Sequence, residues 1–242
     1  MDFLYPPACV LCGEILPQKM SGGVMEKGKS GFNRVCVTCA GKVKVIREPV
    51  CLCCGKTVED PMVEYCFDCE KAEFAFLRNR SVFEYSGGVR NAMHDFKYNH
   101  RKENILFFGD GITEHLGKWI AGLKVDVILP VPVHKRRRRR RGYNQAHLLA
   151  KYVSETLKIP MDTEFLYRVG NTKPQKELGK KERKINLKNA FKISRNELQY
   201  DRVLLIDDIY TTGATLDSAA RALKCAGVRE IYCVTACIGK GY

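Results

Sequence analysis

The chain has 242 residues, of which 45% are hydrophobic and 28% charged, as in an ordinary globular protein. Its net charge of +14 is unevenly placed: residues 133–192 hold eighteen basic and five acidic side chains, whereas residues 1–74 hold nine basic and ten acidic ones. Such a basic stretch attracts polyanions, namely pyrophosphate, nucleic acid or an anionic membrane face. The amino terminus lacks a signal-peptide pattern, and no apolar run approaches the ~20 residues of a spanning helix. We therefore expect a soluble, cytoplasmic protein without a membrane span.

Paired cysteines are the first pattern along the chain. Four Cys-x-x-Cys pairs occur before residue 70, namely Cys9 and Cys12, Cys36 and Cys39, Cys51 and Cys54, and Cys66 and Cys69. Two thiolates on one tight turn reach the same tetrahedral metal, and two such turns close its shell, so the pairs predict two Cys₄ zinc sites. A closed shell leaves no open position, which gives both zinc ions a structural role. Disulfides or free thiols are the alternative, and a reducing cytoplasm argues against disulfides.

The grouping of these zinc ligands stays open at this point. The simplest arrangement joins the first pair to the second and the third to the fourth, but an interleaved arrangement also fits the spacing. Gly13 and Gly55 each follow the second cysteine of a pair, where a knuckle often needs a positive φ. Cys53 is the odd residue, and we predict that it is not a ligand.

The sequence pattern changes near residue 74, which divides a cysteine module (1–74) from a larger domain (75–242). In the larger domain, apolar runs predict strands, and helical spacing of apolar residues predicts helices between them. The expected strands are 82–85, 125–131, 203–206 and 230–235, and the expected helices are 105–119 and 146–157. Strands that alternate with helices through short links imply an α/β fold, in which helices cover both faces of a parallel sheet.

Two basic clusters account for the charge imbalance. Residues 135–141 are seven basic residues in a row after an expected strand, and a second cluster between 173 and 188 includes Lys173 and Arg183. One interpretation is a solvated, mobile charge run. The other is a groove that follows a nucleic-acid backbone, whose binding would fall steeply with salt. Single-strand binders usually add stacking aromatics, for which Tyr143 and Phe191 are the candidates.

The most specific motif joins a buried strand, 203–206, to a loop and a helix. The strand is followed by the acidic pair Asp207 and Asp208 and then by the loop residues Thr211, Thr212, Gly213, Ala214 and Thr215. Open α/β sheets bind ligands at the carboxyl ends of their strands, so we expect both carboxylates at a strand end, outside the core. Backbone N–H groups, threonine hydroxyls and a helix amino terminus can surround a phosphate dianion. The carboxylates can accept hydrogen bonds from ribose hydroxyls, so this order of groups suits a ribose 5-phosphate. The alternative is an ordinary acidic loop with a threonine helix cap.

Residues 203–215 resemble the phosphoribosyl pyrophosphate (PRPP) signature of type I phosphoribosyltransferases. Residues 130–150 resemble the proline-flanked loop and following helix of the ComF family, and residues 172–191 resemble its second block. Tyr85, Gly87 and Lys97 fit the opening strand and helix of that family. Together with the cysteine pairs, the resemblance covers almost the whole chain. It implies a double zinc-ribbon module followed by a type I phosphoribosyltransferase-like domain that binds PRPP with Mg²⁺.

The resemblance also suggests roles for the basic clusters. The first stands where the type I fold places its pyrophosphate loop, which makes Lys135, Arg136 and Arg141 candidate ligands of pyrophosphate or nucleic acid. The second, with Lys173 and Arg183, corresponds to the loop that closes over the active site. Members of the family are linked to uptake of transforming DNA, which implies single-stranded DNA and proteins of the uptake machinery as partners.

Three functions fit these patterns. The chain is an accessory protein of DNA uptake that binds PRPP and single-stranded DNA, an active phosphoribosyltransferase acting on a nitrogenous base, or a PRPP sensor that regulates another protein. The cysteine module offers no recognisable pocket for a base, so the sequence leaves the question of catalysis open.

Overall fold

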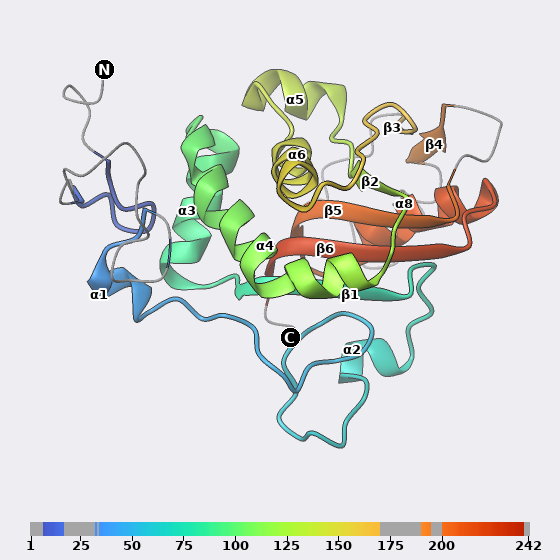
Figure 1. Ribbon diagram of the computed structural model, residues 1–242, viewed down its shortest axis with the longest axis horizontal. Helices are drawn as coiled ribbons and strands as arrows, with labels where there is room; N and C mark the ends of the chain where they lie inside the picture. Colours follow the sequence, from blue (N-terminus) through green and yellow to red (C-terminus); the bar gives the residue numbers. More distant parts are fainter. Residues whose placement is uncertain (1–6, 17–31, 33, 170–189, 195–199, 240–242) are drawn as a thin grey trace.

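A computed structural model describes residues 7–16, 32, 34–169, 190–194 and 200–239. Its centre is a four-stranded sheet in which all neighbouring strands are parallel (Figure 1). The strand order is β1 (Arg78–Glu84), β6 (Glu230–Ile238), β5 (Arg202–Tyr210) and β2 (Val127–Pro130). The predicted parallel sheet is confirmed. No helix of the described part is both long and apolar enough to cross a membrane.

Both faces of the sheet are covered, because alternate residues of each buried strand point to opposite sides. In β5, Val203 and Leu205 belong to one apolar core, and Leu204 and Ile206 belong to the other. One face is covered by helices α3 (Gly87–Tyr98), α4 (Ile105–Gly122) and α6 (Gln145–Leu157), and the opposite face by α8 (Ala214–Cys225). A strand buried on both faces has to be apolar throughout, so the apolar run 203–206 allowed the strand to be predicted from the sequence.

The cysteine module is divided between the two cores. Cys9 is buried in the core beneath α3 and α4, whereas Cys51 and Cys54 are buried in the core beneath α8. Figure 1 shows the first part of the module beside α3 and the second part around the short helix α2 (Phe67–Glu70). The packing of the protein therefore runs across residue 74, where the sequence pattern changes.

Between its two parts, the cysteine module covers the outer edge of β1. The Ile46 N–H donates to the Val82 carbonyl at 2.8 Å, and the Glu84 N–H donates to the Lys44 carbonyl at 2.9 Å. An uncovered edge strand presents unpaired backbone groups that other chains can pair with. The connecting segment satisfies these groups at one edge of the sheet.

The first basic cluster is not the loop that the sequence suggested. Residues Lys135–Arg141 form a short helix, α5, whose two ends are capped. At its start, His134 Nδ1 accepts a hydrogen bond from the Arg136 N–H at 3.2 Å. At its end, Gly142 has a φ of +77° and donates its N–H to the Arg138 carbonyl. Arginine has a high helix propensity, so these caps stabilise a helix despite the repulsion between like charges.

The remaining elements of the described residues are short, and the sequence did not predict them. A two-stranded antiparallel ribbon pairs β3 (Leu166–Arg168) with β4 (Phe191–Ile193). The others are α1 (Val37–Ala40), α2 and a 3₁₀ turn, η1 (Lys102–Asn104). Elements of three or four residues carry too little periodicity to be recognised.

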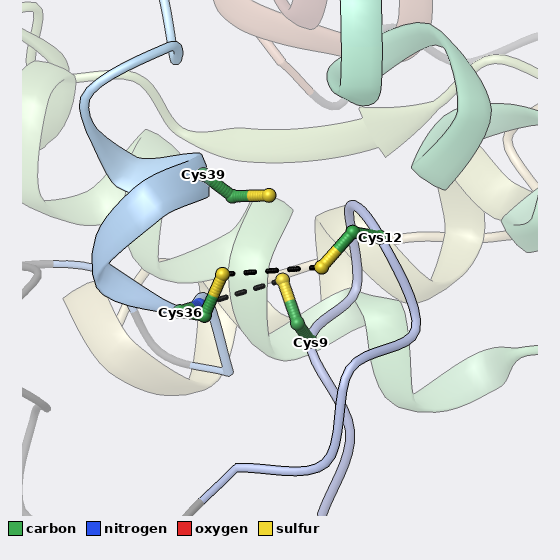
Figure 2. A group of neighbouring side chains, drawn as sticks. All are labelled: Cys9, Cys12, Cys36 and Cys39. Atoms are coloured by element: carbon green, nitrogen blue, oxygen red, sulfur yellow. Dashed lines mark hydrogen bonds between the residues drawn. The ribbon is translucent and has the colours of Figure 1, made fainter.

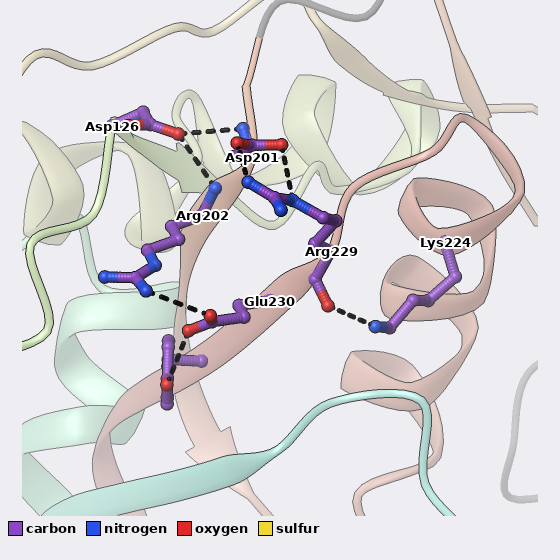
Figure 3. Close-up of polar contacts among 7 residues, drawn as sticks. Asp126, Asp201, Arg202, Lys224, Arg229 and Glu230 are labelled. Carbon is purple, nitrogen blue, oxygen red and sulfur yellow. Dashed lines mark hydrogen bonds and ion pairs between the residues drawn. The ribbon is translucent and has the colours of Figure 1, made fainter.

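A network of charged groups joins the amino ends of the strands (Figure 3). Asp126 Oδ2 accepts from the N–H groups of both Asp201 and Arg202 at 2.8 Å. Arg202 forms an ion pair with Glu230 at 3.1 Å, and Arg229 donates to the Asp201 carboxylate. The network links the starts of β2, β5 and β6 and leaves the opposite, carboxyl ends of the strands for a ligand.

Candidate metal centres and ligand-binding site

The eight paired cysteines form two compact groups. In each group all four sulfur atoms lie within 4.8 Å of one another, and the groups are Cys9, Cys12, Cys36 and Cys39, and Cys51, Cys54, Cys66 and Cys69. We call these the first and the second cysteine set. Figure 2 shows the first set, with Cys36 just before α1, Cys39 within it, and Cys9 and Cys12 on the facing loop. The simplest grouping is confirmed, the interleaved one is wrong, and Cys53 lies outside both groups.

The sulfur positions fit zinc. The Sγ atoms of Cys12 and Cys36 are 3.9 Å apart, and those of Cys54 and Cys66 are 3.6 Å apart. A tetrahedron with Zn–S bonds of about 2.3 Å has edges of about 3.8 Å. Four thiolates at this spacing are the ligand set of a structural zinc site, and the chain has two of them.

One knuckle in each cysteine set has a glycine with a positive φ, as the sequence predicted. Gly13 has a φ of +80° and Gly55 a φ of +75°. A Cβ atom at Gly55 would also lie 2.7 Å from the Asn79 carbonyl oxygen. Asn79, at the start of β1, donates its N–H to the Cys53 carbonyl at 2.7 Å and its side-chain amide to the Cys54 carbonyl at 2.8 Å. The second cysteine set is thus docked directly on the sheet.

The sequence placed the acidic pair at the end of a strand, outside the core. In the structure the pair lies within the strand instead. Strand β5 continues past the pair to Tyr210, because β6 is long enough to pair with it there. Asp207 is partly buried and Asp208 is only 9% exposed. Both carboxylates therefore lie at the carboxyl edge of the sheet but belong to its packed part.

The two carboxylates have different partners. Asp208 accepts a hydrogen bond from the ammonium group of Lys97, on α3, at 2.6 Å, and both side chains are largely buried. Asp207 Oδ1 accepts from the Asp208 N–H at 2.8 Å. Burial and the neighbouring Asp208 carboxylate raise the pKa of Asp207 to about 7. Asp208 is fixed by a cation, whereas Asp207 exchanges a proton near neutral pH.

The short loop after β5 leads directly into the amino terminus of α8. Asp207, Thr211, Gly213 and Thr215 line a hollow at this point, so the structure brings them together. Gly213 has a φ of +75°, and a Cβ atom there would lie 2.5 Å from the hydroxyl oxygen of Tyr210. The predicted loop ends at Gly213, because Ala214 and Thr215 already belong to α8; Thr212 and Ala214 do not line the hollow. Free N–H groups at a helix start and threonine hydroxyls are the groups that bind phosphate.

The basic residues predicted for the site differ in what they offer. Lys135 and Arg136 are exposed on α5. Arg141 is 8% exposed, and its guanidinium donates to Gln145 Oε1 at 3.2 Å and to the Tyr98 hydroxyl at 3.1 Å. Arg141 therefore attaches α5 to the rest of the fold. The sequence analysis predicted that it contacts a ligand, but its guanidinium is used within the protein. Lys173 and Arg183 lie outside the described residues.

Arg168, at the end of β3, is a site residue that the sequence analysis did not identify. Burial and the charge of Arg137 lower its pKa, and the charge of Asp207 acts in the opposite direction. Its guanidinium carbon lies 5.3 Å from the centre of the Phe191 ring. Arg168 therefore lies within electrostatic range of both Arg137, on α5, and Asp207. The only local signal was a cation at the end of a short apolar run.

The aromatic side chains proposed as stacking platforms are not available to a nucleic acid. Tyr143 and Phe191 are 8% and 5% exposed. The Tyr143 hydroxyl donates to the Phe96 carbonyl at 2.5 Å, so its ring is packed in the core and its hydroxyl is already hydrogen-bonded within the protein. The interpretation of these two residues as base-stacking groups is wrong.

The sheet, with an acidic pair and a loop at a helix start on its carboxyl edge, defines a phosphoribosyltransferase-type domain that follows a double zinc ribbon. Family models agree: "Double zinc ribbon domain" matches residues 1–70, and "Phosphoribosyl transferase domain" matches residues 117–241. The chain belongs to the ComF family, since it is 32% identical to Competence protein F of Haemophilus influenzae over 222 residues, which covers 83% of this chain and 95% of that protein.

Two further relatives extend this result. Competence protein ComFC of Bacillus subtilis is 32% identical over 221 residues, with 89% of this chain and 88% of that protein covered. DNA utilization protein YhgH of Salmonella typhimurium is 30% identical over 207 residues, with 83% and 89% covered. A solved purine phosphoribosyltransferase from Pyrococcus horikoshii aligns over 54% of this chain and 80% of its own, at 17% identity, with a TM-score of 0.33, too low to carry an argument.

Proposed function

We propose that this protein binds PRPP together with Mg²⁺, binds single-stranded DNA through its basic surface, and serves as an accessory protein in DNA uptake. The observation that carries the proposal is the hollow at the start of α8, which combines a carboxylate, Asp207, with the hydroxyl and N–H groups of the loop. The names of its relatives, a competence protein and a DNA utilization protein, support the biological setting.

The ligand's 5′-phosphate is assigned to residues 211–215, which are the end of the loop and the start of α8, where hydroxyls and the amino terminus of the helix favour a dianion. The ribose hydroxyls are assigned to the acidic pair, because an ionised carboxylate accepts hydrogen bonds. Asp207 has to lose its proton for this role, and its pKa of about 7 makes binding weaker in mildly acidic solution. The oxygen ligands that Mg²⁺ prefers are present in the pair and in the pyrophosphate. Bound Mg²⁺ would neutralise the charge of the pyrophosphate.

The nucleic-acid part of the proposal rests on α5. Residues 135–140 are basic and exposed along this helix, which follows the carboxyl end of β2, the strand next to β5. Arg137 lies close enough to Arg168 to influence its pKa, and Arg168 in turn is influenced by Asp207. These charge effects support a DNA-binding surface next to the proposed PRPP site. With Tyr143 and Phe191 buried, we expect contacts to the phosphate backbone to dominate, and hence low sequence preference.

An active phosphoribosyltransferase is the second candidate, and the intact acidic pair and loop favour it. In that reaction a nitrogen of the base forms a bond to C1 of the ribose while the bond from C1 to pyrophosphate breaks. A screen of nitrogenous bases for pyrophosphate release tests this candidate. A PRPP sensor would keep the same loop without turnover, and it would show ligand binding in the absence of any released pyrophosphate.

Calorimetric titration with PRPP and Mg²⁺ tests the main proposal. The wild-type protein should bind, and Asp207→Asn should weaken binding at least about tenfold, the loss of one charge-assisted hydrogen bond. Asp60→Asn, an exposed carboxylate on the cysteine module, is the matched control and should bind like the wild type. Equal affinity in Asp207→Asn and wild type would contradict the assignment. Repeating the titration with saturating single-stranded DNA tests whether the two ligands affect each other.

A further inference from the structure

The segment that follows the second cysteine set lies against the phosphate-binding loop. The Ala75 N–H donates to Asp217 Oδ1, in the first turn of α8, at 2.8 Å. The Phe74 ring lies so near the loop that a Cβ atom at Gly213 would be 3.0 Å from it. These contacts join residues that are about 140 positions apart in the chain. One helical turn thus carries both the proposed phosphate site and an attachment to the cysteine module.

Further contacts fasten this attachment on both sides. Arg221 donates to the Glu73 carbonyl at 3.0 Å and to Asp217 Oδ2 at 2.8 Å, so it bridges the segment and the helix. The rings of Phe74 and Phe76 are stacked with their centres 4.8 Å apart. Phe76 is buried in the same core as three ligands of the second cysteine set, Cys51, Cys54 and Cys69. A continuous packed path leads from the second zinc site to the loop.

Tyr210 forms a second route between the same two places. It is the last residue of β5, is 3% exposed, and belongs to the core that contains the second cysteine set. A Cβ atom at Gly213 would lie 2.5 Å from its hydroxyl oxygen, so the loop rests directly on the ring. Displacement of the second cysteine set would therefore disturb the packing of Tyr210 against the loop as well as the contacts of Phe74 and Ala75 with the loop and α8.

The first cysteine set has no comparable connection. It packs in the other core, on the opposite face of the sheet, where Leu11 would meet a Cβ atom at Gly88, near the start of α3, at 3.0 Å. In the described residues no hydrogen bond or ion pair joins this set to residues 211–217. The first zinc site can therefore serve as an internal control, because the two sites have the same ligands and only the second is attached to the loop.

We infer that the second zinc site holds the phosphate-binding loop in its binding conformation through Phe74, Ala75 and Asp217, and that the first zinc site does not. The inference rests on the proposed binding of PRPP. Coupling between two sites is reciprocal, so if zinc in the second site strengthens PRPP binding, PRPP has to strengthen zinc retention there by the same factor. Typical couplings are about 5- to 150-fold, and the direct hydrogen bond and ring contact lead us to expect roughly tenfold.

Pulsed alkylation read by mass spectrometry separates the two sites. The zinc-loaded protein is mixed with a zinc-selective chelator and N-ethylmaleimide, with and without PRPP and Mg²⁺. PRPP should slow alkylation of the second cysteine set about tenfold and leave that of the first set unchanged. Equal protection of both sets, or of neither set in protein shown by calorimetry to have bound PRPP, would overturn the inference.

Two variants of Asp217 distinguish coupling from general loss of structure. Asp217→Ala removes the acceptor of the Ala75 N–H and should abolish the selective protection and weaken PRPP binding about tenfold. Asp217→Asn keeps a side-chain oxygen as acceptor and should retain both effects. Far-ultraviolet circular dichroism checks that both variants are folded. If Asp217→Ala keeps the selective protection, the route through this residue is wrong.

Hydrogen exchange tests the attachment of residues 211–217 to the second zinc site without PRPP, so its failure can be told apart from failure of the proposed function. If the wild-type protein does not bind PRPP, the proposed function fails, and hydrogen exchange tests the coupling without a ligand. Removal of zinc from the second set should then speed exchange of the amides of residues 211–217 and leave those of α6 unchanged. Unchanged exchange at residues 211–217 after loss of that zinc would overturn the inference itself.

Discussion

Lys97 on α3 and Asp208 on β5 form a buried ion pair, with 2.6 Å between the ammonium nitrogen and a carboxylate oxygen and side-chain exposures of 14% and 12%. The pair joins two elements separated by 111 positions in sequence. It fixes the backbone at the acidic pair and holds a negative charge in place next to Asp207. Burial is the largest cause of the raised pKa of Asp207; the charge of Asp208 raises it further, whereas the charge of Lys97 lowers it.

Replacement of Asp208 alone should destabilise the protein. Asp208→Asn leaves the Lys97 charge buried without its counter-charge, and loss of one partner of a buried pair typically costs about 3 kcal/mol. The double variant Lys97→Met plus Asp208→Asn removes both charges and should recover most of that loss. Urea unfolding of the three proteins measures the effect. If the double variant is less stable than Asp208→Asn, the ion pair is not the cause.

Stability should depend on pH through Asp207. Its pKa is about 7 in the folded protein, against about 3.9 for an unperturbed aspartate, so the folded state holds the proton more tightly than the unfolded state. The stabilisation is fully present below about pH 4 and is lost as the pH rises through 7. Asn cannot ionise, so the free energy of unfolding of Asp207→Asn should not show this loss. Between pH 5.5 and pH 8 the free energy of unfolding of the wild type should fall by at least about 1 kcal/mol more than that of Asp207→Asn.

Urea unfolding at those two pH values, with zinc present, checks this expectation. Asp60→Asn, at an exposed position, is the control and should follow the wild-type pH dependence. A pH dependence that is the same in Asp207→Asn and wild type would show that Asp207 titrates at its ordinary pKa.

The sheet could be predicted from the sequence because its strands are buried on both faces. Residues 203–206 are all fully buried, and burial on both faces demands an uninterrupted apolar run. The length of β5 could not be predicted in this way. Its extension through the acidic pair depends on pairing with β6, where Asp207 lies opposite Thr235 and Tyr210 opposite Ile238. Such pairing leaves no local mark on the sequence.

Roles of single polar residues were the hardest part of the site to predict. The seven basic residues of α5 looked alike, yet Arg141 is buried against Gln145 and Tyr98 whereas Lys135 and Arg136 are exposed. The difference arises from tertiary contacts that no spacing shows. The helix has local signals at its ends, His134 before it and Gly142 after it, which the interpretation of residues 135–141 as a charge run or loop did not use.

The exposed arginines of α5 should control the salt dependence of DNA binding. Changing residues 136–140 together to glutamine keeps good helix formers and removes five charges. Each charge that contacts a phosphate of a single strand contributes about 0.7 to the slope of log K against log salt, so the slope should fall by up to about 3.5. Fluorescence anisotropy with a labelled oligothymidylate at several salt concentrations measures it.

Arg141→Gln is the matched control on the same helix. It removes one charge that the fold already uses, so it should lower stability by about 1 kcal/mol, the value of its hydrogen bonds, and leave the slope nearly unchanged. If Arg141→Gln reduces the slope as much as an exposed arginine does, its side chain contacts DNA and its buried position is not maintained in the complex.

The two zinc sites should differ in their contribution to stability. Metal analysis of the purified protein should return two zinc ions per chain, one for each cysteine set. Cys12→Ser and Cys54→Ser should each lose one ion, but Cys12 is exposed whereas Cys54 is 1% exposed in the core under α8. Loss of the second site therefore opens a packed core, and the melting temperature should fall clearly more for Cys54→Ser. Calorimetric melting of the two variants decides the matter, and an equal or larger fall for Cys12→Ser would mean that the first set supports the fold as strongly as the second.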